Sequence, residues 1–104
     1  MVFVETPIFT RLVTEALSDE DYGVFQQALA SKPDAGQLFR GGGGIRKVRW
    51  ALPGRGKSGG IRVIYYWRVT ADQIFLLYLF AKGERSDLTP AQVKTLAKLA
   101  KDLK

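Results

Sequence analysis

The chain runs GIRKVRWALPGRGKSGGIRVIYY from Gly44 to Tyr66, and this stretch decides the fold. Residues 45–50 and 61–69 alternate in side-chain character with a period of two, which predicts two β-strands joined by a basic, glycine-rich loop. The same alternation places Lys47 and Arg49 on one face of the first strand. It places four alternate residues on one face of the second: Arg62, Ile64, Tyr66 and Arg68.

Positive charge is concentrated in this part of the chain. The whole sequence has 16 Lys and Arg against 10 Asp and Glu, a net charge of +6, yet residues 41–70 contain no carboxylate. Such a patch is typical of a surface that binds a polyanion, most often nucleic acid. Solvated strand edges are often basic as well, so the charge alone is equally compatible with an ordinary solvated surface. The cations of the block are Arg46, Lys47, Arg49, Arg55, Lys57, Arg62 and Arg68.

Composition sets further bounds. A chain of 104 residues predicts a single domain, residues 1–104, with one core. There is no cysteine and no histidine, which removes thiolate chemistry, the commonest metal ligand and the commonest general base. We therefore expect no metal and no cofactor. The apolar run Ile74 to Ala81 is far too short to span a membrane, and no signal peptide is evident, so a cytoplasmic location is expected.

Helix signals flank the basic strands. Val2 to Val4 predicts a first strand, and Thr6 with Pro7 predicts a helix start. Ser18 predicts a second start, and the helical hairpin from Thr6 to Lys32 should cover one face of a sheet. Its apolar positions are Phe9, Leu12, Val13, Ala16 and Leu17, then Tyr22, Phe25, Ala28 and Leu29.

The C-terminal third predicts a buried strand and a well-capped helix. Ile74 to Ala81 is apolar throughout, as in a central strand. Thr89, Pro90 and Gln92 form a capping box. The predicted order is β-α-α-β-β-β-α, an α+β domain with a mainly antiparallel four-stranded sheet, in which residues 34–44 are a loop. The last helix has an apolar face and a solvated one; the apolar face is Val93, Leu96, Ala97, Ala100 and Leu103, and the solvated face is Lys94, Lys98 and Lys101.

One apparent motif is rejected. Gly56-Lys57-Ser58 resembles the end of a phosphate-binding P-loop, but position 51 is alanine instead of glycine, and a strand follows where a helix is required.

Three ordered pieces resemble the RelE/HigB family of bacterial toxins, with the HigB branch closest. They are GIRKVRW (44–50), GRGKSGGIRVIYY (54–66) and FAKGERSDLT (80–89). The resemblance covers nearly the whole chain and implies the RelE fold. It also implies a ribosome-dependent mRNA endonuclease, or mRNA interferase, that inhibits translation. Its partner would be a cognate antitoxin, similar to the helix-turn-helix HigA proteins.

The resemblance also implies site residues. The cations of the RelE pattern correspond to Lys47, Arg49 and Arg62, followed by Lys82 and Glu84. RelE itself carries an arginine and a tyrosine where this chain has Gly83 and Thr89, so its acid and base do not transfer directly. The remaining cations, Arg46, Arg55, Lys57 and Arg68, are expected to bind RNA or the ribosome.

These residue types suit RNA cleavage by the adjacent 2′-hydroxyl. Arg62 can bind phosphate oxygens in a bidentate manner, and Lys47 and Arg49 can flank it and stabilise the extra negative charge. Without histidine, the proton must move through Glu84 or Lys82; a surface ion pair between these two is the competing interpretation.

Two other classes remain open from the sequence. One is a non-catalytic toxin like the ParE relatives, which share the fold and act on gyrase. The other is a passive RNA- or ribosome-binding module. Cutting of mRNA on translating ribosomes separates the enzyme from both.

Binding to RNA or ribosomes should weaken as salt rises, because bound cations release counterions condensed on the polyanion. Titrations between low and moderate salt would measure the slope of log affinity against log salt. A slope of zero would contradict a polyanion ligand for the acid-free block.

Overall fold

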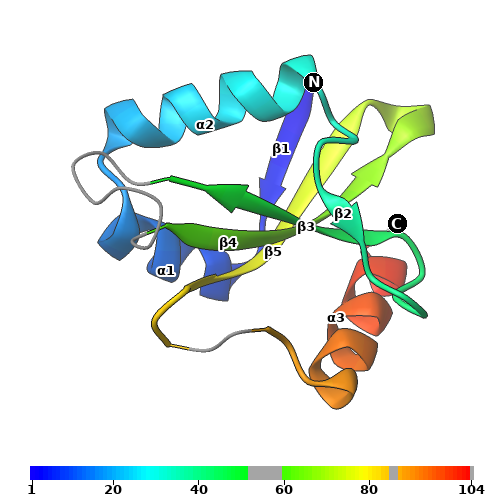
Figure 1. Cartoon of the computed structure of the whole chain (residues 1–104). Coiled ribbons are helices and arrows are strands. Elements are labelled where there is room, and N and C mark those ends of the chain that lie inside the picture. The colour runs from blue at the N-terminus through cyan, green and yellow to red at the C-terminus, as the bar shows by residue number, and fades with distance from the viewer. Residues whose placement is uncertain (52–59, 85–86, 104) are drawn as a thin grey trace.

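The computed structural model describes residues 1–51, 60–84 and 87–103. Five strands form one sheet in the order β1-β5-β4-β3-β2, with helices on both faces (Figure 1). β1 runs parallel to β5, and the other neighbours are antiparallel. The elements are β1 (Val2–Glu5), α1 (Pro7–Ala16), α2 (Asp19–Ser31), β2 (Gln37–Leu38), β3 (Ile45–Trp50), β4 (Ile61–Arg68), the 3-10 turn η2 (Val69–Ala71), β5 (Gln73–Ala81) and α3 (Pro90–Asp102).

The α+β architecture and the element order agree with the sequence prediction, but the sheet has a fifth strand. The segment predicted as loop contains β2, which pairs with Arg46 and Lys47 of β3. The chain reverses between the two strands through glycines, and Gly44 has a φ of +103°. A Cβ on Gly44 would lie 2.9 Å from Tyr66 Cε1, so a side chain would not fit there. Two residues carry no detectable alternation, so the sequence could not indicate this strand.

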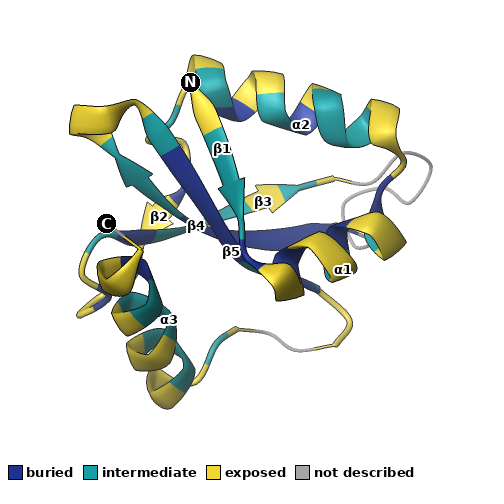
Figure 2. Ribbon diagram, turned by 180° about the vertical axis from the view of Figure 1, so that it is seen from behind, coloured by how far each residue is buried: buried dark blue, intermediate teal, exposed yellow. Residues whose placement is uncertain are grey.

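The central strands are buried on both faces (Figure 2). One face of β4 and β5 packs against α1 and α2, and the other face packs against α3. Two predicted core positions are wrong, because Ala28 and Leu103 are exposed. The buried residues of the first layer include Phe9, Val13, Phe25, Leu29, Val63, Tyr65 and Leu76; those of the second include Ile45, Ile64, Phe75, Leu77, Phe80 and Ala100.

All three predicted helix starts are confirmed. Thr6, Ser18 and Thr89 are N-caps whose side chains accept hydrogen bonds from backbone N–H groups, and Thr89 with Gln92 forms the full capping box. β4 ends at Arg68, one residue before its predicted end, because η2 begins there. No helix within the described ranges is long and apolar enough to cross a membrane.

Thr6 joins α1 to an irregularity in the sheet. The pairing of β4 with β5 skips Leu77, because Ile64 pairs with Tyr78 and Tyr65 pairs with Leu76. The hydroxyl of Thr6 accepts from the Phe9 N–H and donates to the Leu77 carbonyl at 2.9 Å. The carbonyl of Leu77, the extra residue in β5, therefore accepts a hydrogen bond from the side chain that also caps α1.

Tyr65 ties β4 to the segment that follows α2. Its buried hydroxyl donates to the Pro33 carbonyl at 2.7 Å and accepts from the Gly36 N–H at 2.8 Å. Burial raises the pKa of Tyr65, although the Gly36 hydrogen bond and nearby Arg46 oppose the shift. A Cβ on Gly36 would lie 2.7 Å from Tyr65 Cε1, so this position also requires glycine.

Tyr65→Phe should destabilise the fold by about 1–3 kcal/mol, because a buried carbonyl and a buried N–H lose their partner. Urea unfolding followed by circular dichroism measures the loss. Tyr78→Phe is the matched control, since Tyr78 lies on the neighbouring strand and its hydroxyl forms no hydrogen bond among the described residues. Equal stability losses in the two variants would contradict a structural role for the Tyr65 hydroxyl.

Candidate nucleic-acid interface

The pairing of β3 with β4 brings three of the predicted site residues together. Arg49 lies directly opposite Arg62, and Lys47 lies opposite Ile64, one diagonal position from Arg62. Ile64 packs in the layer that contains α3, so these cations are on the α3 face of the sheet. The predicted sharing of a face by Lys47 and Arg49, and by Arg62 and Ile64, is confirmed. We name Lys47, Arg49 and Arg62 the cationic cradle.

Arg62 is the buried member of the cradle. It is 9% exposed, and it is the only buried charged side chain in the described part of the chain. Its Nη1 donates to the Ile61 carbonyl at 3.4 Å, and its cross-strand neighbours are Arg49 and Phe80. Within the described residues, neither Arg62 nor Arg49 forms an ion pair. Burying a guanidinium beside a like charge is electrostatically unfavourable, and a bound anion would offset that cost.

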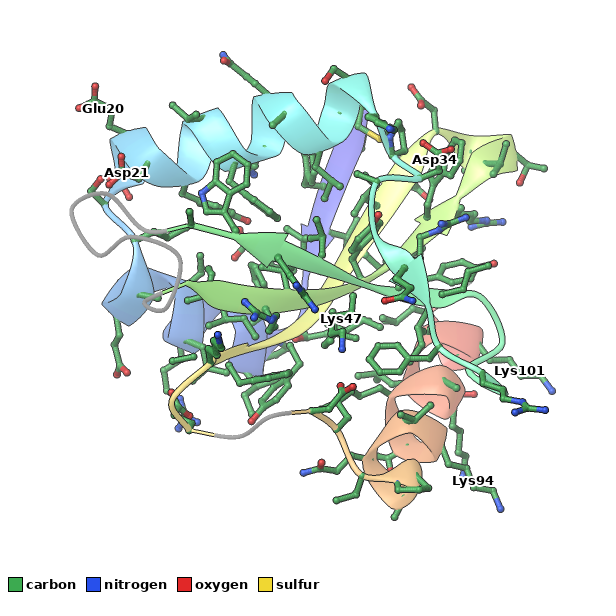
Figure 3. The ribbon with its side chains drawn as sticks, in the orientation of Figure 1. Glu20, Asp21, Asp34, Lys47, Lys94 and Lys101 are labelled. Atoms are coloured by element: carbon green, nitrogen blue, oxygen red, sulfur yellow. The ribbon has the colours of Figure 1, made fainter. Side chains whose placement is uncertain are left out.

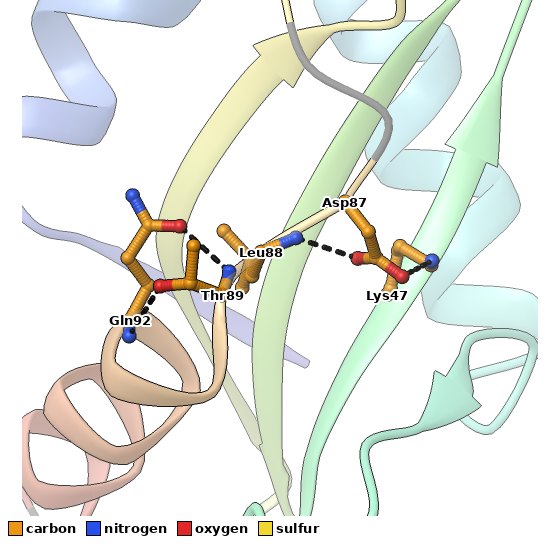
Figure 4. A network of polar contacts seen from close by, with 5 residues as sticks. All are labelled: Lys47, Asp87, Leu88, Thr89 and Gln92. Carbon is orange, nitrogen blue, oxygen red and sulfur yellow. Dashed lines mark hydrogen bonds and ion pairs between the residues drawn. The ribbon is translucent and has the colours of Figure 1, made fainter.

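Lys47 already holds an anion. Its Nζ donates to Asp87 Oδ2 at 2.8 Å (Figure 4). The same Nζ lies 5.5 Å from the centre of the Phe39 ring. The side chain of Lys47 is 14% exposed, whereas that of Asp87 is 48% exposed. Asp87 comes from the segment between β5 and α3, so 40 residues separate the pair in sequence. The sequence analysis missed this contact, because an aspartate just before a helix N-cap gives no sign of a distant lysine.

The pKa of Asp87 reports this environment. Burial alone would raise it, but the hydrogen bonds from Lys47 and the Leu88 N–H, with the positive charges of Lys47 and Arg62, lower it below the ordinary value. Since Arg62 contributes, its charge acts on the position that the carboxylate occupies. The Asp87 carboxylate therefore lies within the field of the cradle.

The two residues predicted for proton transfer lie at the end of β5. The Lys82 N–H donates to the Gly60 carbonyl at 3.1 Å, and its side chain is exposed. Glu84 Oε1 accepts from the Ala81 N–H at 3.4 Å. Glu84 also lines a hollow with residues of α1, on the face away from the cradle. No ion pair joins Lys82 to Glu84 in the described structure.

Of the four cations predicted to bind RNA, the two in the described part of the chain lie apart from the cradle. Arg46 lies on the other face from Lys47, and its Nη1 donates to the carbonyls of Asp34 and Gly36 at 3.2 and 2.8 Å. Arg68 ends β4, six residues from Arg62, which corresponds to about 20 Å of extended strand. Arg55 and Lys57 lie outside the described residues. The lysines of α3 are exposed as predicted, and Lys94 and Lys101 point away from the sheet (Figure 3).

Fold and site together define a small α+β protein with a buried arginine at the centre of a cationic sheet face. A family model described as "RelE toxin of RelE / RelB toxin-antitoxin system" matches residues 4–104. The chain belongs to the RelE toxin family. It is accordingly the toxin of a toxin-antitoxin system, and its family implies a cognate antitoxin.

Lys47→Met should raise the pKa of Asp87 towards its ordinary value of 3.8, because the hydrogen bond and the nearest positive charge disappear. Carboxyl-detected NMR titration measures this change. Folding lowers this pKa, so the pair stabilises the fold above pH 3.8 and loses its contribution as pH falls through the folded value. Lys101→Met is the control, since Lys101 is exposed on α3. If the pKa of Asp87 is the same in Lys47→Met as in the wild type, the ion pair between Lys47 and Asp87 is contradicted.

Proposed function

We propose that the protein is a ribosome-dependent mRNA endonuclease of the HigB branch that inhibits translation. The observation that carries the proposal is the cradle, in which buried Arg62 has Arg49 directly across and Lys47 diagonally across the same sheet face. Strand pairing holds these cations in fixed register, and catalysis of phosphoryl transfer depends on such preorganised charge. The HigB assignment is supported by the sequence pieces at 44–50, 54–66 and 80–89.

The proposed reaction uses the RNA as its own nucleophile. The 2′-oxygen attacks the neighbouring phosphorus, a 2′-O–P bond forms and the P–O5′ bond breaks. The products are a 2′,3′-cyclic phosphate and a 5′-hydroxyl. The 2′-hydroxyl loses a proton and the 5′-oxygen gains one, so protons balance. Arg62, with Lys47 and Arg49 beside it, stabilises the extra charge on the phosphorane.

Proton transfer is proposed for Lys82 and Glu84. Lys82 follows Phe80 by two residues, and Phe80 is on the cradle face opposite Arg62. Lys82 is therefore the nearer of the two in register. Glu84 must release the Ala81 N–H and leave the α1 side before it can reach a substrate in the cradle.

The proposed partners follow from the same reading. A HigA-like helix-turn-helix antitoxin would neutralise the toxin, and Arg46, Arg55, Lys57 and Arg68 would contribute charge for RNA or ribosome binding. The proposed location is the cytoplasm, where translating ribosomes are found. No cofactor or metal is included in the proposal.

Arg62→Gln should reduce mRNA cleavage about a hundredfold or more, because a misplaced or missing charge at the scissile phosphate is costly. Arg68→Gln is the matched control, an arginine of the same strand and predicted face that lies at its far end. It should affect binding alone. Mapping of cut mRNA ends on translating ribosomes measures both, with circular dichroism as a check on folding. A folded Arg62→Gln protein that cuts at the normal rate would place the active site elsewhere.

Expression without an antitoxin should arrest growth, and the same cells separate the competing classes. Cut mRNA in ribosome fractions supports the enzyme. DNA damage linked to gyrase would select the ParE-like interpretation, and ribosome binding without cutting would select a passive module.

A further inference from the structure

Asp87 occupies the position on Lys47 where an anionic ligand of the cradle would bind. Its Oδ2 accepts from Lys47 Nζ and its Oδ1 accepts from the Leu88 N–H, each at 2.8 Å. Both carboxylate oxygens are thus used, with one negative charge between them. A phosphodiester offers the same features, two oxygens that share one charge. In the described part of the chain, this is the one carboxylate that forms an ion pair with a cradle cation.

The solvent exposure of the ion pair between Asp87 and Lys47 allows another anion to replace the carboxylate. Asp87 has nearly half of its side chain exposed, whereas that of Lys47 is mostly buried, with the Phe39 ring and the carboxylate close to its Nζ. An anion arriving from solvent therefore meets Asp87 before it can reach Lys47. Ion pairs with an exposed partner contribute little net stability, so the carboxylate can leave without unfolding the protein.

We propose that Asp87 is an internal counter-ion that an RNA phosphate displaces from Lys47 on binding. This inference rests on the proposed function, because it assigns the occupant of the same cradle. In the free protein, the carboxylate compensates the charge of Lys47. In the complex, a phosphate oxygen takes its place and Asp87 turns towards solvent. No covalent bond changes in this exchange.

The contacts that follow Asp87 in the chain keep its movement from displacing α3. Directly after Leu88, the Thr89 N–H donates to Gln92 Oε1 at 2.8 Å, and the Gln92 N–H donates to Thr89 Oγ1 at 3.2 Å (Figure 4). This capping box fixes the start of α3 independently of Asp87. The carboxylate can therefore leave Lys47 while α3 keeps its place on the sheet.

The test is the binding of a fluorescent RNA oligonucleotide that is 2′-O-methylated throughout and so cannot be cleaved. Asp87→Asn should bind it about fivefold more tightly, the effect of one charge at contact distance in water. Asp102→Asn makes the same change in net charge at an exposed site on α3 and should change affinity by less than about twofold. Lys47→Gln should weaken binding, and in that background Asp87→Asn should give a clearly smaller gain, because no lysine remains for the carboxylate to occupy.

Three results would overturn the proposal. They are equal affinities for Asp87→Asn and Asp102→Asn, a gain from Asp87→Asn that is equally large without Lys47, or no binding of the oligonucleotide by any variant. Cleavage of mRNA on ribosomes reports separately on the proposed function. A wild-type protein that cuts, with an Asp87→Asn variant that binds no better, rejects the counter-ion and keeps the enzyme. A protein that never cuts, with the expected gain and a smaller gain in the Lys47→Gln background, rejects the enzyme and keeps the counter-ion.

Discussion

Strands β4 and β5 are covered on both faces, and this constraint governs the rest of the structure. Nearly every position along them must be apolar, since α1 and α2 cover one side and α3 covers the other. Among their buried positions Arg62 is the exception, a guanidinium held at 9% exposure between buried apolar neighbours. Removing a charge from water costs free energy. The large core offsets that cost, and the result is a cation whose position is set by the sheet.

The register around Arg62 depends on how β5 is built. β5 is regular from Ala81 back to Tyr78 and skips Leu77 before pairing resumes. At the skipped residue, the Leu77 carbonyl accepts a buried hydrogen bond from the Thr6 hydroxyl. The hydroxyl that starts α1 thereby also keeps the apolar residues of β5 facing the correct layers on either side of the irregularity.

Much of this structure follows from local patterns, and the remainder does not. The N-caps Thr6, Ser18 and Thr89 and the alternation along β3 are contained in short stretches, so the sequence predicted the elements and the shared face of Lys47 and Arg49. β2 is too short to show a period. The contact of Lys47 with Asp87 depends on how the chain returns from β5 to α3, which no local pattern encodes.

The same limit applies to residues that share a charge but differ in surroundings. Arg46 and Lys47 are adjacent in sequence. Arg46 binds backbone carbonyls on one face of the sheet, whereas Lys47 belongs to the cradle on the other face and binds Asp87. The sequence analysis assigned both residues to the same cationic patch. Ala28 and Leu103 fit a helical stripe but lie beyond the reach of the sheet and stay exposed, because the width of a buried stripe is set by the partner surface.

The Asp87 carboxylate on Lys47 also has a consequence for how the cradle would distinguish a small anion from a polyanion. Because Asp87 is part of the same chain, it competes for Lys47 at an effective concentration of about millimolar order. A simple monovalent anion gains one contact and must exceed that concentration to replace it. In the proposed complex, a polymer that carries many phosphates would also gain contacts with Arg49 and Arg62, and these added contacts would offset the competition from Asp87. Under the proposed exchange, the Asp87 carboxylate would therefore favour a long polyanion over a small anion that makes a single contact.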